Sequence, residues 1–232
     1  MSDANSEKKS EKQVDEIRQR LIHDDKTAGR KKRIKAILLS VLAVLIIALC
    51  FLIPKVIIPA AGREVSYYKL VNHPEQIQVG DTIYFGGFEV NNTWKVLSVE
   101  DSKILIINEL CLMQVKHNDI YLESTNRTYS LNEWLDDVYY DINFSDKEKA
   151  LIVDEGAGKV FSLSSEEAKI YFRHNSDRRT GYYRNDRGVD WWLRDTSGKE
   201  AYIVNSNGSI DTRSSDSAYG LGVRPAIWLN LN

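Results

Sequence analysis

The longest uninterrupted apolar run in the chain is AILLSVLAVLIIALCFLI at residues 36–53, where Ser40 is the single polar side chain. As an α-helix this run is about 27 Å long, close to the roughly 30 Å hydrocarbon thickness of a bilayer. Pro54 and Lys55 interrupt it, and the apolar residues 56–58 extend it if Pro54 only kinks the helix. The pattern therefore predicts a transmembrane helix over residues 36–58.

Basic residues crowd one side of this run. Residues 20–35 hold seven Lys and Arg, whereas residues 54–73 hold three. The positive-inside rule then predicts a single-pass cell-membrane protein with the tail, residues 1–35, in the cytoplasm and the C-terminal part outside. We expect the basic residues next to the run to contact lipid head groups of the bilayer. They are Arg30, Lys31, Lys32, Arg33 and Lys35.

The tail carries a second, weaker pattern. Val14, Ile17, Leu21 and Ile22 are spaced as one face of a short amphipathic helix. Such a helix could lie on a membrane or pair weakly with its copy, and a specific docking role is the alternative. The thirty-five residues before the apolar run are too long for the leader of a cleavable signal peptide.

Beyond the apolar run, residues 59–79 suggest an extracellular stalk, and residues 80–232 a single globular domain. Three β-rich segments open the domain at residues 82–90, 93–100 and 103–108, and Asn91-Asn92 and Asp101-Ser102 separate them. Asn and Asp tolerate the backbone conformations of short turns. The pattern predicts an antiparallel meander.

Three segments then fit the capping box that begins a helix: SLNE at 130–133, SDKE at 145–148 and SSEE at 164–167. A short strand is expected at 159–163, and residues 173–190 form a long, Arg-rich surface loop of the kind that carries either function or disorder. Strands follow at 191–194, 201–205, 209–211 and 223–231, with a turn at 205–208. The fold class is α+β with antiparallel strands.

Charge and cysteine content narrow the function. The formal net charge is −2, and because residues 1–35 carry eleven Lys and Arg against seven Asp and Glu, the rest of the chain is acidic. An acidic domain has no electrostatic reason to hold a polyanion, so we expect no nucleic-acid partner. Cys50 and Cys111 are the two cysteines, so no disulfide is possible within the domain, which hints at a bacterial surface protein.

Catalytic and metal-binding signatures are absent from the sequence. The four His residues, at positions 23, 73, 117 and 174, have no spacing typical of metal ligands, so we predict no metal site and no cofactor. There is no G-x-S-x-G nucleophile motif and no phosphate-binding glycine loop. Asp136 and Asp137 fall on the polar face of a predicted helix. No catalytic residue is assigned.

The strands near the C-terminus supply the candidate ligand-binding residues. Neighbouring residues of a strand face opposite sides, so one of Trp191 and Trp192 should be core and the other exposed. An exposed Trp beside Arg, Asn and Asp is suited to stacking on a sugar ring or holding a peptide. The alternative is that these side chains are internal struts. The candidates are Trp191, Trp192, Arg194, Asp195, Tyr202, Asn205, Asn207, Asp211 and Arg224.

Several segments in one order carry a resemblance: GDTIYFGGFEV, SLNEWLDDVYY, KVFSLSSEEAKIYF, WWLRD, AYIVNSNGSID and GVRPAIWL. Together, over about residues 80–231, they resemble a bacterial domain-of-unknown-function family numbered 6273. The closing section also looks like the C-type-lectin-like and formylglycine-generating-enzyme-like fold. Cys111 is the single thiol of the domain, and the calcium-binding Glu-Pro-Asn type motif of sugar-binding lectins is absent. The activities of those proteins therefore do not follow from the resemblance.

These patterns favour a membrane-anchored domain that binds a cell-wall glycan or a surface protein without catalysis. Two alternatives stay open. One is a hydrolase acting on the cell wall, with a site assembled from distant carboxylates. The other is a sensory or structural subunit of a membrane complex.

Overall fold

A computed structural model of the chain describes residues 35, 37–50, 58–87, 92–182, 188–217 and 220–231. The chain divides into two compact units, residues 1–55 and 56–232. The predicted amphipathic helix with Val14, Ile17, Leu21 and Ile22, and the basic residues 30–33, lie outside the described residues.

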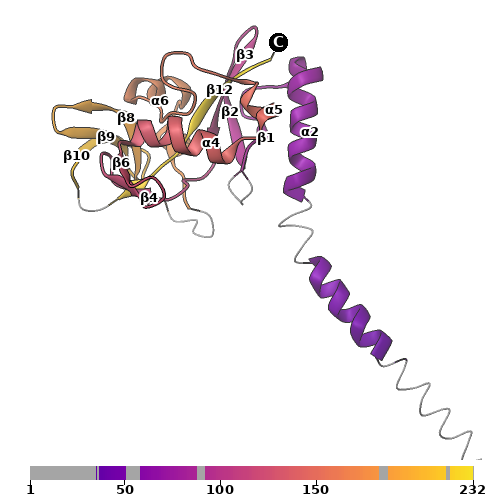
Figure 1. Ribbon diagram of the computed structural model, residues 1–232. Helices are drawn as coiled ribbons and strands as arrows, with labels where there is room; N and C mark the ends of the chain where they lie inside the picture. The colour runs from indigo at the N-terminus through magenta and orange to yellow at the C-terminus, as the bar shows by residue number, and fades with distance from the viewer. Residues whose placement is uncertain are drawn as a thin grey trace, which may run out of the picture. The chain divides into compact units, whose positions relative to one another are not determined.

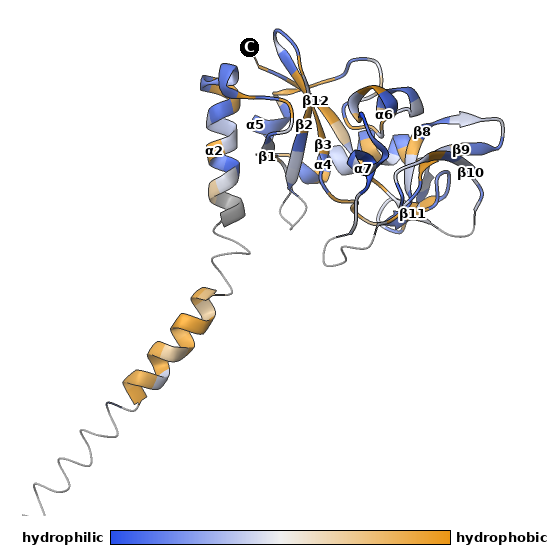
Figure 2. Ribbon diagram, turned by 180° about the vertical axis from the view of Figure 1, so that it is seen from behind, coloured by the Kyte–Doolittle hydropathy of each residue, from blue (hydrophilic) through white to orange (hydrophobic). Residues whose placement is uncertain are grey.

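The prediction of a transmembrane helix over residues 36–58 is wrong. Across the described part of the chain, every helix is too short or too polar to cross a bilayer. The apolar helix is described over residues 37–50, and Figure 2 shows it as mostly hydrophobic. The other end of the predicted span, Ile58, begins a different and more polar helix.

That helix, α2 (Ile58–Asn72), occupies most of the segment expected to be a stalk, and the short η2 (Pro74–Gln76) follows it. Figure 1 shows α2 beside β1 (Thr82–Tyr84). Gly62 allows the close approach, because a Cβ there would lie 2.8 Å from the Tyr84 ring. The Tyr84 amide donates to Ser66 Oγ at 3.0 Å, and Leu70 is buried. The segment is thus a packed helix.

The first sheet has the order β1-β2-β3-β12-β7, with all of its pairs antiparallel. The predicted meander is confirmed as β1, β2 (Thr93–Val99) and β3 (Lys103–Asn108). The last strand of the chain, β12 (Ala226–Asn230), pairs along β3, and β7 (Ile152–Val153) closes the edge. The predicted strand at 159–163 reduces to one bridge, between Phe161 and Ala226.

The second sheet has the order β10-β9-β8-β11-β4 and contains the predicted C-terminal hairpin. Its pairs are antiparallel except the contact of β11 with β8. Its strands are β4 (Gln114–Val115), β8 (Trp191–Ser197), β9 (Glu200–Val204), β10 (Ile210–Ser214) and β11 (Leu221–Gly222). A small hairpin, β5 (Ile120–Leu122) with β6 (Arg127–Tyr129), stands apart from both sheets.

All three predicted capping boxes are present. The carboxylates of Glu133, Glu148 and Glu167 accept from the backbone N–H of the Ser three residues earlier, at 2.9, 2.9 and 2.8 Å. The boxes begin α3 (Leu131–Glu133), α5 (Asp146–Lys149) and α6 (Ser165–Tyr171). The π-helical η3 (Trp134–Tyr139) and α4 (Tyr140–Asn143) continue the first helix, and α7 (Asn175–Arg178) lies in the predicted loop.

Two hydrophobic clusters fill the domain, and they share the strands of both sheets. One contains Trp94, Trp134 and Trp192, and the other contains Trp191 and Trp228. The alternating residues of β3 and β8 therefore enter different clusters on the two faces of each sheet. Both faces are covered, so the described residues form a layered α+β domain with predominantly antiparallel sheets.

Candidate functional site

Trp191 and Trp192 do not form an exposed ligand face. Both are 0% exposed, which corrects the expectation that one of the pair would be accessible. Their indole N–H groups are also satisfied, since Trp191 Nε1 donates to the Arg178 carbonyl at 3.2 Å and Trp192 Nε1 to the Val115 carbonyl at 2.8 Å. The side chains do point to opposite faces of β8, but each face is covered by a hydrophobic cluster.

Arg194 and Asp195 connect β8 to the start of α6. Both terminal nitrogens of the Arg194 guanidinium donate to the Glu167 carboxylate, and the distance from Nη2 to Oε1 is 2.6 Å. Arg194 Nη1 also donates to the Ser162 carbonyl at 3.0 Å. Asp195 accepts from the Ser165 backbone N–H at 2.8 Å and from its hydroxyl. These contacts match the alternative that the pair serves as internal struts.

Arg224 lies in the core at 3% exposure. Its Nε donates to the Asn108 carbonyl at 2.8 Å, and its guanidinium stands 5.4 Å from the ring centres of Phe172 and Trp191. Burial lowers the pKa of Arg224 to about 10, although Cys111 and Glu109 oppose the shift. Even so, the group remains charged at neutral pH and adds a buried positive charge to this part of the domain.

The remaining candidates lie along β9, its turn and β10. Asn205 Nδ2 donates to Ser209 Oγ at 3.1 Å, and Asn207 Oδ1 accepts from the Ser209 backbone at 2.9 Å, so both amides stabilise the predicted turn. Tyr202 is half-buried against the cluster of Trp191, and Asp211 is exposed. None of these four side chains lines the cleft that opens next to α7.

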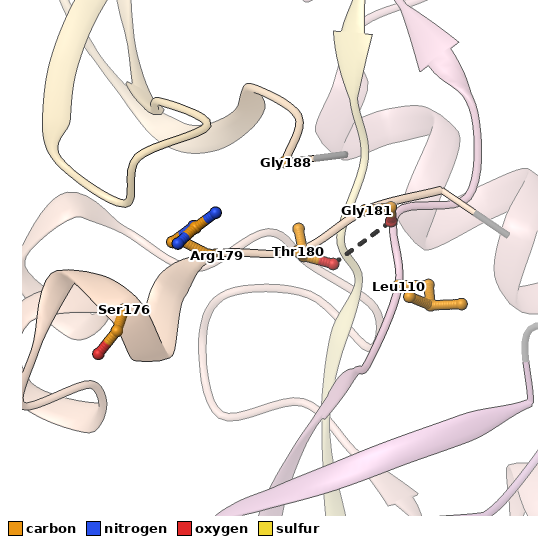
Figure 3. A pocket seen from close by; sticks show the side chains of 6 residues that line it. All are labelled: Leu110, Ser176, Arg179, Thr180, Gly181 and Gly188. Carbon is orange, nitrogen blue, oxygen red and sulfur yellow. Dashed lines mark hydrogen bonds between the residues drawn. The ribbon is translucent and has the colours of Figure 1, made fainter. Parts of the chain in front are cut away.

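A cleft of about 340 Å³ opens elsewhere, next to α7. Figure 3 shows its lining: Ser176, Arg179, Thr180 and Gly181 follow one another along one segment, and Leu110 lies beside Gly181 on another. Leu110 follows β3, whereas the other residues belong to the predicted loop at 173–190. Tertiary packing therefore brings together segments that are about 70 residues apart.

A second buried arginine, Arg178, fixes the segment of backbone that lines the cleft. Arg178 is 7% exposed, and its guanidinium donates to the carbonyls of Gly208 at 2.8 Å and Phe172 at 2.9 Å. Thr180 is buried on the other side of the same segment, and its hydroxyl donates to the Glu109 carbonyl at 2.8 Å. Arg179, between these two fixed residues, is exposed at the cleft.

Arg178, Arg179 and Arg224 bring positive charge to this site. Arg224 Nη1 reaches the Arg178 carbonyl at 3.4 Å, so a buried guanidinium lies under the backbone that carries Arg179. Within the part of the chain that the structure describes, Arg179 has no ion pair and no side-chain hydrogen bond. The nearby Asp177 is already engaged, because it accepts from the His174 backbone at 3.2 Å and the Ser176 hydroxyl at 3.1 Å. Arg179 can therefore donate to an incoming anion.

Cys111 lies beside the cleft but is not poised for chemistry. Its side chain is 0% exposed, and burial raises the pKa of its thiol to about 12, in spite of Arg224 and Thr180. A thiol with that pKa stays protonated and is a poor nucleophile near neutral pH. Among the residues with described positions, no three His, Cys, Asp or Glu side chains cluster in a way that could hold a metal ion.

Residues 101–231 match the family described as Domain of unknown function (DUF6273). The chain belongs to this family. The match includes every residue of the cleft and ends one residue before the C-terminus, so the candidate site lies wholly within the DUF6273 domain. Comparison with curated proteins and with solved structures gives no match.

Sequence reasoning missed the cleft residues of this DUF6273 domain. The useful signal was the Arg-rich loop at 173–190, which was expected to carry function or disorder. Nothing in the sequence separates Arg178, which is buried, from Arg179, which is exposed. That distinction depends on the carbonyls of Gly208 and Phe172, which capture one guanidinium and leave the other outside.

Proposed function

We propose that the DUF6273 domain is a non-catalytic binding domain that takes an acidic group of a glycan or peptide ligand into the cleft beside α7. The observation that carries this proposal is the exposed Arg179 guanidinium between two immobilised neighbours. A fixed backbone reduces the entropy lost when a ligand is bound. A guanidinium forms two parallel hydrogen bonds with a carboxylate, which provides both affinity and orientation.

The rest of the cleft fits the same ligand. Leu110 offers an apolar wall for the part of the ligand next to its acidic group, and the Ser176 hydroxyl, which donates to Asp177, can accept from a donor of the ligand. The buried charges of Arg178 and Arg224 favour an anion over a cation in this cleft. A catalytic role for the cleft has less support, because the Cys111 thiol beside it is buried and its raised pKa keeps it protonated.

Binding arrays test the proposal. The full chain is applied to a glycan array with acidic and neutral members and to a peptide array with free and amidated carboxylates. We expect acidic probes to be retained, and Arg179→Ala to weaken their binding about tenfold or more, since a hydrogen bond to a charged group contributes about 1.5–3 kcal/mol. Arg179→Lys should retain part of the affinity because it keeps the charge but loses the paired geometry.

The matched control is Arg127→Ala, which removes an exposed arginine on β6. It should bind like the wild type. Equal binding by the Arg179→Ala variant would contradict the proposal, and a turnover that disappears when a single Asp or Glu is replaced would favour the hydrolase. A bacterial origin, a location at a cell surface, contact with lipid and a C-type-lectin-like fold stay predictions.

A further inference from the structure

One face of α2 carries apolar side chains that the domain does not cover. Val65, Tyr68 and Val71 are 67%, 58% and 47% exposed, whereas Leu70 on the other side is 1% exposed. Isolated exposed apolar residues are common on protein surfaces. Here they recur along a single helix, so their spacing decides whether they form a contact surface.

The spacing is that of a coiled coil. The exposed residues Ala61, Val65, Tyr68 and Asn72 are separated by four, three and four positions, which places them alternately at the d and a positions of a heptad repeat. A β-branched residue at an a position favours two strands, and a polar residue such as Asn at another a position fixes the register. We call these four residues the α2 seam.

The domain packs against other positions of the helix, and of these Gly62, at an e position, lies beside the seam. Arg63 and Leu70 take the f positions, which are farthest from the seam, and both are turned toward the domain. Arg63 donates to the Gly87 carbonyl at 3.2 Å and pairs with Glu148 at 3.3 Å. Ser66 accepts from the Tyr84 backbone, as described above. The packing of α2 against the domain thus leaves the seam clear for another helix.

The charged residues beside the seam indicate which helix would pair with it. Glu64 and Lys69 fall at the g and e positions beside the seam, five residues apart. In a parallel pair of identical helices, a g residue of one chain faces the e residue five positions later in the other, so Glu64 meets Lys69 of the second copy. Each has an exposed partner within its own chain, Lys147 at 2.8 Å and Asp81 at 3.7 Å, and such pairs are readily exchanged.

We propose that the α2 seam pairs in parallel with the α2 seam of a second copy of this chain. A two-fold axis along the helices sets Val65 against Val65 and Tyr68 against Tyr68. Two heptads of isolated peptide are too short to be a stable helix, but the domain already holds α2 folded, and this lowers the entropic cost of pairing. The dimer should be weak and dependent on concentration.

Disulfide trapping in the full chain tests this arrangement. In a Cys50→Ser background, which removes an exposed thiol, Tyr68→Cys and Val65→Cys are each oxidised under mild conditions. Both variants should form covalent dimers several times faster than Ile170→Cys, a control on α6 that is 64% exposed. Using two seam positions keeps the test valid if one replacement disturbs the fold.

Two outcomes of the trapping experiment would overturn the proposal. Trapping no faster than the control would show that the seam has no partner copy, and trapping only in a mixture of the two seam variants would indicate antiparallel helices. Charge reversal adds a separate readout by sedimentation. Glu64→Lys and Lys69→Glu should each weaken the dimer, and the double variant should restore it, because the exchanged charges again face each other; failure to restore it would also overturn the pairing.

Discussion

Replacing Glu148 with Gln tests how the domain holds α2. The carboxylate is buried, with 4% of the side chain exposed, and its two oxygens collect several donors. Oε1 accepts from the Gly86 backbone at 2.9 Å, Oε2 accepts from the Ser145 backbone and hydroxyl, and Arg63 Nη2 donates to both oxygens at 3.3 Å. A glutamine has nearly the same shape but only one oxygen.

The expected loss of stability follows from these contacts. If the amide oxygen keeps the Ser145 bonds that cap α5 and one contact with Arg63, the amide nitrogen faces the Gly86 N–H, which is also a donor, and Arg63 loses its charged partner. Hydrogen bonds to a charged group contribute about 1.5–3 kcal/mol, and a buried donor left without an acceptor is destabilising in itself. We expect Glu148→Gln to lower the free energy of unfolding by about 3 kcal/mol. That corresponds to about 6–12 °C in the midpoint of thermal unfolding for a unit of this size.

The effect should also depend on pH. Burial by itself raises the pKa of Glu148, but hydrogen bonds from Ser145 and Gly86 and the charge of Arg63 outweigh it and leave the pKa below its ordinary value of 4.5. A lowered pKa in the folded state contributes stability that is complete above about pH 4.5 and is lost as the pH falls through the folded-state value. Glutamine does not titrate there, so the gap between wild type and variant should narrow in acid.

Urea unfolding followed by tryptophan fluorescence, at several pH values, measures both effects. Glu133→Gln is the matched control, because Glu133 forms the same capping box with Ser130 but its side chain is 49% exposed. Its replacement should be much less destabilising. Equal losses in the two variants, or a gap for Glu148→Gln that persists unchanged in acid, would refute the view that a buried charged network holds this region.

Two further predictions concern backbone space and thiol access. Gly208→Ala should be severely destabilising, because φ is +87° and the new Cβ would lie 1.7 Å from a neighbouring carbonyl oxygen. Gly198→Ala, at φ +63° with open space around it, should lower the free energy of unfolding by only about 1–2 kcal/mol. Equal midpoints of thermal unfolding for the two variants would contradict this prediction. Cys111 should resist iodoacetamide at about pH 8 until denaturant is added, while the exposed Cys50 reacts at once. Mass spectrometry follows the modification of both thiols. Modification of Cys111 in the folded chain as fast as that of Cys50 would contradict the burial of Cys111.

The sequence by itself determined those elements whose signals are local. The three capping boxes were predictable because a Ser and the Glu three residues later satisfy each other's backbone within one turn. The meander of β1 to β3 was predictable because β-branched and aromatic residues are concentrated in three neighbouring segments, and Asp101-Ser102 favours a turn between the last two. The apolar run at 36–53 also gave a strong local signal, yet hydropathy alone does not decide whether a helix crosses a bilayer, and no helix among the described residues is long and apolar enough to do so.

Tertiary structure alone decided which side chains remain available to a ligand or a partner. Strand alternation placed Trp191 and Trp192 on opposite faces, as expected, but exposure depends on what covers each face, and both are covered by residues from distant segments. The same reason separates Arg178 from Arg179 in the cleft. Local sequence sets the direction of a side chain, whereas burial is a property of the neighbours that packing brings to it.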